Sequence, residues 1–250
     1  MTIIVRDMKF DLENWLLKDW CFNNPFFTAF FNAISLSFPE GEKAFIASVR
    51  AYRNEIKDKR LLKDIDLFCK QEAMHIREHK KYNKLLCDLR GYDQEKLEKK
   101  YQGLFANEDK LGKLATTVGM EHLTALLGVQ VAYTNNLIKD KTNPVAKLWE
   151  WHAKEEVEHK SVAFDVYNQV SGDSKFRQTM MVKKSLGLFS TAFFIALRML
   201  KHDKQLWKWN TFKSILAFFF HRNGLVRGNF RRYNMFFKQN FHPTLITETI

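Results

Sequence analysis

Apolar residues recur every three or four positions along almost the whole chain, which is the spacing of one face of an α-helix. The sequence lacks the clear period-two alternation that predicts half-buried strands. The 250 residues include only 10 Gly and 4 Pro, few for the many turns that a large sheet protein needs. The sequence therefore predicts an all-α fold.

Four long helices are expected in the first 170 residues, preceded by one short helix. Pro39 suits the first turn of a helix, Gly91 suits a helix end, and Asn143 suits a cap. The connection between the second and third long helices is the longest, and ferritin-like folds need one such crossover. We therefore expect a ferritin-like four-helix bundle with additional N- and C-terminal helices. The expected helices cover residues 26–37, 39–56, 61–90, 110–138 and 143–170.

Charge divides the chain into two expected domains. Residues 171–250 carry 14 Lys and Arg against three Asp and Glu, which is +11 of the total net charge of +12. We expect a helical bundle over residues 1–172 and a basic, aromatic-rich helical extension over residues 173–250 that packs on it. Three Cys without a CxxC pair indicate reduced thiols, and the acidic N-terminal stretch is unlike a secretion signal, so a cytoplasmic protein is expected.

Two of the expected helices carry the same short motif, Glu-x-x-His. It is formed by Glu72 and His75 in one helix and by Glu156 and His159 in another, and residues three apart lie on one helix face. Carboxylates on inward faces add to this pattern. One is Glu121 in an apolar stretch, and the other is Glu42, which is favoured over Glu40 because it shares a face with Phe45, Ile46 and Val49.

One Glu from each of two helices and Glu-x-x-His from each of two others form the ligand set of dinuclear carboxylate bundles. Two divalent cations bring about four positive charges, which four carboxylates neutralise in a dry core. Oxygen and imidazole ligands without Cys favour iron, with manganese or a mixed Fe/Mn centre as alternatives. The predicted metal ligands are Glu42, Glu72, His75, Glu121, Glu156 and His159. A solvated helix surface rich in Glu and His is the alternative interpretation.

Three further polar residues lie one turn from the predicted ligands. His79 follows His75, while His152 and Glu155 precede Glu156 and His159. Each is a candidate for an additional ligand, or for a hydrogen-bond partner that orients a ligand.

The motifs resemble a bacterial family of the ferritin-like superfamily, the predicted metal-dependent hydrolases. The resemblance covers nearly the whole chain, and it implies a helical bundle with a dinuclear metal centre held by the six residues predicted above. The word hydrolase in the family name is itself a prediction, so it says little about the reaction. The segments that carry the resemblance are FPEGEKAF, QEAMHIREHKKYN, EHLTA, WEWHAKEEVEHKSVAFDVY, GLVRG and NFHPTL.

The predicted centre is compatible with three functions. A di-iron centre that activates O2 to oxidise or oxygenate a small apolar organic substrate is favoured, because anionic oxygen ligands stabilise high-valent iron. Two metals that lower the pKa of a bridging water and hydrolyse an ester, amide or phosphate are the alternative. Iron storage is a third possibility. Motifs for nucleotide binding or for a serine nucleophile are not found.

The C-terminal third combines basic residues with Phe and Trp. Its stretch SLGLFSTAFFIAL has 13 uncharged residues, short for a bilayer span. Two more helices that pack on the bundle are expected. The alternative is peripheral contact with the inner face of an anionic membrane. Interleaved Phe, Leu and Ile argue against nucleic-acid binding. A homodimer is expected as the commonest oligomer.

Overall fold

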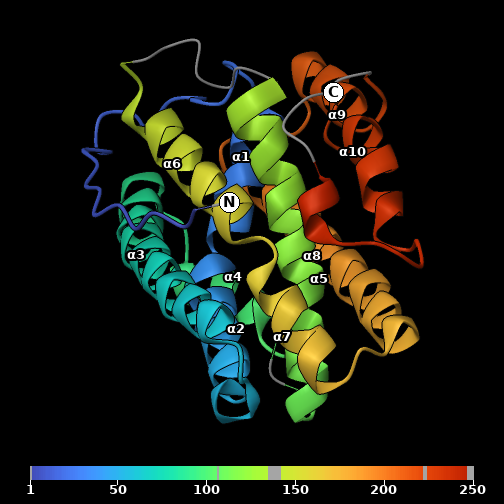
Figure 1. The fold of residues 1–250 in the computed structure, drawn as a ribbon. Coiled ribbons are helices and arrows are strands. Elements are labelled where there is room, and N and C mark those ends of the chain that lie inside the picture. The colour runs from blue at the N-terminus through green and yellow to red at the C-terminus, as the bar shows by residue number, and fades with distance from the viewer. Residues whose placement is uncertain (1, 106, 135–141, 222–223, 247–250) are drawn as a thin grey trace.

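The computed structural model describes residues 2–105, 107–134, 142–221 and 224–246. These residues form an all-α protein, and none of them lies in a strand. Helix α5 lies at the centre, with α2 and α3 on one side and α8, α9 and α10 on the other (Figure 1). The α-helices are α1 Pro25–Ser35, α2 Phe38–Arg50, α3 Lys59–Arg90, α4 Gln94–Glu98, α5 Lys110–Val129, α6 Pro144–His159, α7 Val162–Val170, α8 Ser174–His202, α9 Trp209–Phe220 and α10 Leu225–Met235.

Local sequence signals set most of the helix boundaries. Asp58 and Asn143 cap α3 and α6 by each accepting hydrogen bonds from two backbone N–H groups, and Asp109 caps α5 by accepting one from Gly112. At the other end of α3, Gly91 has a φ of 68°, a left-handed conformation that Gly adopts without steric cost. These residues therefore mark the ends of three helices that carry predicted ligands.

The predicted continuous helix over residues 143–170 is wrong in one respect, because two residues interrupt it. Helix α6 ends at His159, and α7 begins at Val162 after a turn at Lys160 and Ser161. The buried ammonium group of Lys160 donates to the carbonyl oxygen of Ile246 at 2.7 Å. This partner lies 86 residues away, so the local sequence pattern does not reveal it.

Two further predicted boundaries differ from the structure. The helix expected over residues 39–56 ends as α2 at Arg50, and a separate 3-10 turn covers Arg53–Glu55. The helix expected over residues 110–138 is regular only to Val129, and a π-helical turn over Gln130–Thr134 follows it. Residues 135–138 lie outside the described part of the chain.

Helix α5 contacts both the ligand-bearing helices and the C-terminal helices. It packs against α2, α6 and α7, and also against α8 and α10. A Cβ atom at Gly128 would lie 2.7 Å from the carbonyl oxygen of Ala153, so this Gly lets α5 approach α6 closely. One continuous hydrophobic core includes residues from both sides of position 172. The division into domains 1–172 and 173–250 and the ferritin-like bundle topology stay predictions.

Helix α8 is the one helix of the described chain that is long and apolar enough to cross a membrane. Its apolar residues pack against α1 and α5 instead of forming a uniformly exposed surface. Core helices of soluble proteins can also have this length and apolar composition. Peripheral membrane contact therefore stays a prediction.

Candidate metal centre

Seven acidic and imidazole side chains meet between α2, α3, α5 and α6. Each is at most 3% exposed, so the cluster is enclosed by the protein. All six ligands predicted from the sequence belong to it, together with His152. The members are Glu42 on α2, Glu72 and His75 on α3, Glu121 on α5, and His152, Glu156 and His159 on α6.

Helical periodicity explains how so few elements bring these side chains together. Residues three, four or seven positions apart lie on one face of a helix, so His152, Glu156 and His159 form one row on α6. Glu72 and His75 form a shorter row on α3. The face of α6 that holds its row is buried.

The potential ligand atoms form two neighbouring groups. Glu42, His75, His152 and Glu156 make one group, and Glu72, Glu121 and His159 make the other, with all ligand atoms of a group within 4.8 Å of one another. In the second group, Nε2 of His159 lies 3.2 Å from Glu121 Oε2 and 3.4 Å from Glu72 Oε1. Ligands about 2.1 Å from one metal ion are about 3 to 3.5 Å apart. The geometry therefore suits one cation in each group.

Two carboxylates lie between the groups. Oε1 of Glu156 is 3.1 Å from Nε2 of His152, 3.4 Å from Nδ1 of His75 and 3.5 Å from Nε2 of His159. The carboxylate of Glu72 places one oxygen 3.8 Å from Nδ1 of His75 and the other 3.4 Å from Nε2 of His159. Both carboxylates therefore lie within reach of imidazoles of both groups.

Most of the potential ligand atoms of the cluster lack hydrogen-bond partners among the described residues. Both oxygens of Glu42, Glu72 and Glu121 are buried and unpaired, as are His75 Nδ1, His152 Nε2 and His159 Nε2. A buried polar group without a partner costs about 1 to 3 kcal/mol, and a charged one costs more. These unpaired oxygen and nitrogen atoms are directed at one place, which fits a bound cation. The charge of the four carboxylates matches that of two divalent ions.

The pKa values of these groups are shifted because several carboxylates are buried close together. Burial, reinforced by neighbouring carboxylates, raises the pKa values of Glu42 and Glu72 well above their usual range. Burial lowers the pKa of His75, but the hydrogen bond with Glu155 and the nearby carboxylate of Glu156 outweigh it and raise this pKa to about 10. The protein alone therefore compensates its buried carboxylates by retaining protons, a role that cations can take over.

Hydrogen bonds orient the imidazoles of His75 and His159. His75 directs Nδ1 to the cluster, and its Nε2 donates to Glu155 Oε2 at 3.1 Å. His159 directs Nε2 to the cluster, and its Nδ1 donates to Gln71 Oε1 at 2.9 Å. Such outer partners fix the tautomer that leaves the other ring nitrogen free to bind a metal ion. Glu155 is therefore placed behind His75, outside the ligand groups.

A chain of hydrogen bonds orients the third imidazole, that of His152. Its Nδ1 donates to Nε2 of His79 at 2.9 Å, and Nδ1 of His79 donates to the hydroxyl of Ser35 at 2.8 Å. The Ser35 hydroxyl donates to Asn83 Oδ1 at 2.6 Å. Each group donates one proton onward, so Nε2 of His152 stays unprotonated and faces Glu42 and Glu156. His152 thus belongs to the cluster, and His79 lies behind it.

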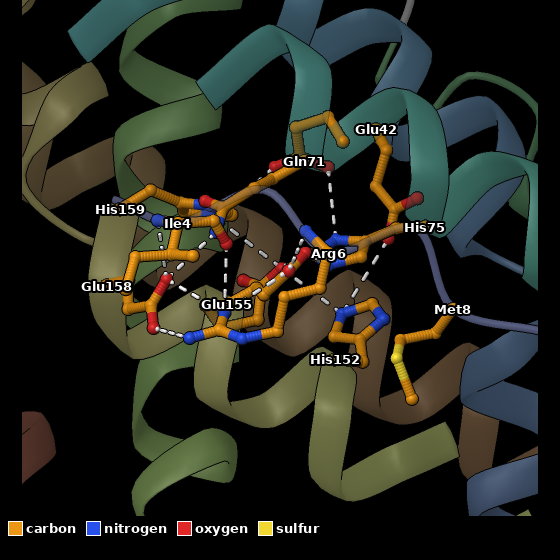
Figure 2. Close-up of polar contacts among 12 residues, drawn as sticks. Ile4, Arg6, Met8, Glu42, Gln71, His75, His152, Glu155, Glu158 and His159 are labelled. Atoms are coloured by element: carbon orange, nitrogen blue, oxygen red, sulfur yellow. Dashed lines mark hydrogen bonds and ion pairs between the residues drawn. The ribbon is translucent and has the colours of Figure 1, made fainter. Parts of the chain in front are cut away.

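An arginine near the N-terminus joins the supports of two imidazoles (Figure 2). Arg6 contacts Glu155 Oε1 through its backbone N–H at 3.0 Å and its guanidinium at 3.3 Å, and it contacts Glu158 at 2.6 Å. Glu158 in turn accepts from Gln71 at 3.0 Å. Glu155 is the partner of His75, and Gln71 is the partner of His159. The guanidinium of Arg6 therefore stabilises the hydrogen-bond partners of both imidazoles.

Sequence reasoning named Glu155 as a candidate partner but missed Gln71, Glu158 and Arg6. Gln71 and Glu158 are each next to a predicted ligand, a signal that could have identified them. Arg6 is 149 residues from Glu155, and no sequence pattern connects the two. Glu40, the alternative to Glu42, is exposed beside Lys43. The next residue after Glu121, the buried His122, packs against Phe236 and Phe241, away from the cluster.

A family model matches the chain, while two other comparisons found nothing. Searches of curated proteins and of solved structures found no match. The family model of the predicted metal-dependent hydrolases matches residues 4–246. This range is almost the whole chain and includes Arg6 and the cluster. The chain therefore belongs to the family of predicted metal-dependent hydrolases.

Proposed function

We propose that the protein is a dinuclear metal enzyme. Glu42, His75 and His152 would bind one divalent ion, Glu121 and His159 would bind the other, and Glu72 and Glu156 would bridge them. The observation that carries this proposal is the set of buried, unpaired oxygen and nitrogen atoms directed at one place. Four carboxylates and three imidazoles without thiolate suit iron or manganese.

Hydrolysis is the reaction that the family supports best. When bound, two divalent ions supply Lewis acidity and activate water for attack on an ester, amide or phosphate. The protein's own residues hold the imidazoles in the required tautomers, through Glu155 for His75, Gln71 for His159 and His79 for His152. The enclosing helices exclude bulk water, which strengthens every electrostatic interaction at the site.

Oxidation of an apolar substrate with O2 is the second candidate. Two observations favour it: four of the seven potential ligand residues are carboxylates, and none of the seven is more than 3% exposed. Anionic ligands stabilise higher oxidation states of iron, and O2 is small and apolar enough to enter a closed core. The two candidates differ in their need for O2 and for electrons.

One experiment separates the candidates. The protein reconstituted with iron or manganese is incubated anaerobically with p-nitrophenyl acetate, p-nitrophenyl phosphate and a p-nitroanilide. In parallel, the reduced iron form is mixed with O2 in an oxygen electrode and an absorption spectrometer. Metal-dependent release of p-nitrophenol or p-nitroaniline without O2 supports hydrolysis. O2 consumption with an accompanying spectral change, and no hydrolysis, supports oxidation.

The variant Glu156→Ala is the control, because Glu156 contacts both groups of ligands. Either activity should be lost in it. Activity that persists in this variant at the wild-type rate would arise elsewhere and would contradict the proposal.

A further inference from the structure

Exposed apolar side chains are concentrated on the three C-terminal helices. The described chain exposes 15 large apolar side chains, and ten of them lie on α8, α9 and α10 or between α8 and α9. Soluble proteins expose such residues singly, whereas a contiguous group marks a surface that binds a partner. The ten residues are Val182, Leu186, Phe194, Trp207, Trp209, Phe212, Leu216, Phe220, Val226 and Phe230.

Contacts between the helices place these residues on one side of the molecule. Helix α9 packs beside the C-terminal half of α8, where the rings of Phe193 and Phe219 lie 5.8 Å apart. Helix α10 follows the N-terminal half of α8, where Ser185 Oγ and Tyr233 OH lie 3.0 Å apart. All three helices lie on the side of α5 opposite α2 and α3 (Figure 1).

The exposed residues of α8 and α10 form neighbouring rows. Leu186, Phe194 and Arg198 are separated by eight and four positions on α8, and Val226 and Phe230 are separated by four on α10, so each set lies on one helix face. The apolar members of both rows border the same surface hollow. The two rows therefore belong to one continuous surface.

The same helices are strongly basic. Residues 174–246 contain 14 Lys and Arg but only one acidic residue, Asp203, which pairs with Arg90. Several basic residues stand next to exposed apolar ones, as Lys208 does between Trp207 and Trp209. Seven exposed basic residues form no ion pair with any described residue, namely Arg198, Lys201, Lys204, Lys208, Lys213, Arg227 and Arg231.

An anionic membrane matches both properties of this surface. Lipid headgroups pair with Lys and Arg, and the boundary between headgroups and acyl chains takes up Trp, Phe and Leu. A second copy of the chain would bring two sets of the same basic residues together across a two-fold interface, where they repel. A nucleic acid would pair with the basic residues but leave most of the Phe and Leu side chains in water.

Helix α8 can contact a membrane without crossing it. Its buried residues, such as Ile195 and Met199, are each 1% exposed and belong to the hydrophobic core. A membrane-spanning position would separate α8 from α1 and α5, which it packs against. A helix that lies in the membrane surface buries only its exposed row, and the fold stays intact.

We propose that the ten apolar and seven basic residues listed above, the C-terminal face, bind the surface of an anionic membrane. The apolar side chains enter the boundary between headgroups and acyl chains, and the basic side chains contact the headgroups. This binding does not involve the metal centre, so the proposal stands or falls separately from the proposed function.

Vesicle flotation tests the proposal on the full-length wild-type protein. One set of vesicles contains phosphatidylcholine alone, and the other contains about one-third phosphatidylglycerol. We expect strong binding to the anionic vesicles, weak binding to the neutral ones, and loss of binding as the ionic strength rises. A wild-type protein that does not float with the anionic vesicles would overturn the proposal.

Two double variants with equal net charge test where the membrane binds. Arg198→Glu/Arg231→Glu reverses two exposed charges of the C-terminal face, and Lys57→Glu/Arg60→Glu reverses two exposed charges at the start of α3. One basic residue at an anionic surface strengthens binding about fivefold, so the first variant should bind at least about 25-fold more weakly. Equal weakening in the second variant would show a general charge effect and contradict the location.

Trp fluorescence locates the contact directly. Trp207 and Trp209 are 91% and 65% exposed, whereas Trp20, Trp149 and Trp151 are at most 6% exposed. Anionic vesicles with brominated acyl chains should quench the emission of the wild type, because bromine quenches Trp only at close range. Trp207→Phe/Trp209→Phe should still bind these vesicles but lose most of the quenching. Undiminished quenching in this variant would place the contact elsewhere.

A second matched pair tests the apolar contribution. Leu186 is 66% exposed on the C-terminal face, and Ile4 is 50% exposed beside α6. Leu186→Ser should bind anionic vesicles about tenfold more weakly, and Ile4→Ser should bind as the wild type does. Circular dichroism checks that every variant is folded. A wild-type dimer that binds no vesicles, and that Leu186→Ser converts to a monomer, would show that a second copy covers the face.

Discussion

Replacing Arg6 by Ala tests whether the N-terminal segment organises the metal centre. The substitution removes the guanidinium contacts with Glu155 at 3.3 Å and Glu158 at 2.6 Å, and it leaves the backbone bond to Glu155 intact. Glu155 is fully buried and keeps only that bond and the one from His75. Its charge then loses the guanidinium cation beside it.

The magnitude follows from the burial of the partners. Removing one member of a fully buried ion pair costs about 3 to 5 kcal/mol. The Arg6 side chain is 32% exposed, so water replaces part of the interaction, and we expect a loss of about 2 kcal/mol in the free energy of unfolding. Loss of a partner that orients a ligand lowers metal affinity by about 10- to 100-fold.

The assay pairs chemical denaturation of the metal-free protein with competition for metal against a chelator. Arg77→Ala is the matched control, because Arg77 is 31% exposed and holds the same segment through Asp7 at 2.6 Å and the Met8 carbonyl at 2.7 Å. We expect both variants to lose stability and only Arg6→Ala to lose metal affinity. Equal loss of affinity in both would reduce Arg6 to a structural contact, and wild-type affinity in Arg6→Ala would show that Arg6 does not organise the metal centre.

Three further predictions concern the centre and its frame. Gly128→Ala should destabilise the protein by about 1 to 3 kcal/mol in denaturation experiments, despite the better helix propensity of Ala, because the new methyl group meets a carbonyl oxygen of α6 at 2.7 Å. His152→Ala should reduce the metal content to about one ion per chain by elemental analysis, whereas His122→Ala, which removes a buried imidazole elsewhere, should not. Metal binding should release protons and weaken as the pH falls, because the raised pKa values of Glu42 and Glu72 leave these groups protonated in the metal-free protein. Calorimetry in buffers of different ionisation enthalpy measures this proton release.

The sequence was sufficient to predict the parts of the site that depend on one helix. The spacing of Glu72 and His75 places both side chains on one face whatever the tertiary structure is. The solitary Glu121 in an apolar helix indicates a buried carboxylate by contrast with its neighbours. The all-α class follows from the same periodicity.

The parts that depend on how helices pack could not be predicted. His79 and His152 are each one turn from a predicted ligand, and the relative rotation of α3 and α6 decides which of them enters the cluster. Arg6 and Lys160, which lies at the helix break, both have partners far away in the sequence. Such contacts follow from the complete fold and leave no periodic trace in the chain.

The central claim is that two metal ions share one buried set of carboxylates. Elemental analysis of the wild type and of Glu156→Ala, purified side by side from medium with iron and manganese, tests it most directly. We expect about two ions per wild-type chain and loss of both in the variant, because Glu156 lies between the two groups. A folded wild-type protein that binds no metal, or a variant that keeps two ions per chain, would contradict it.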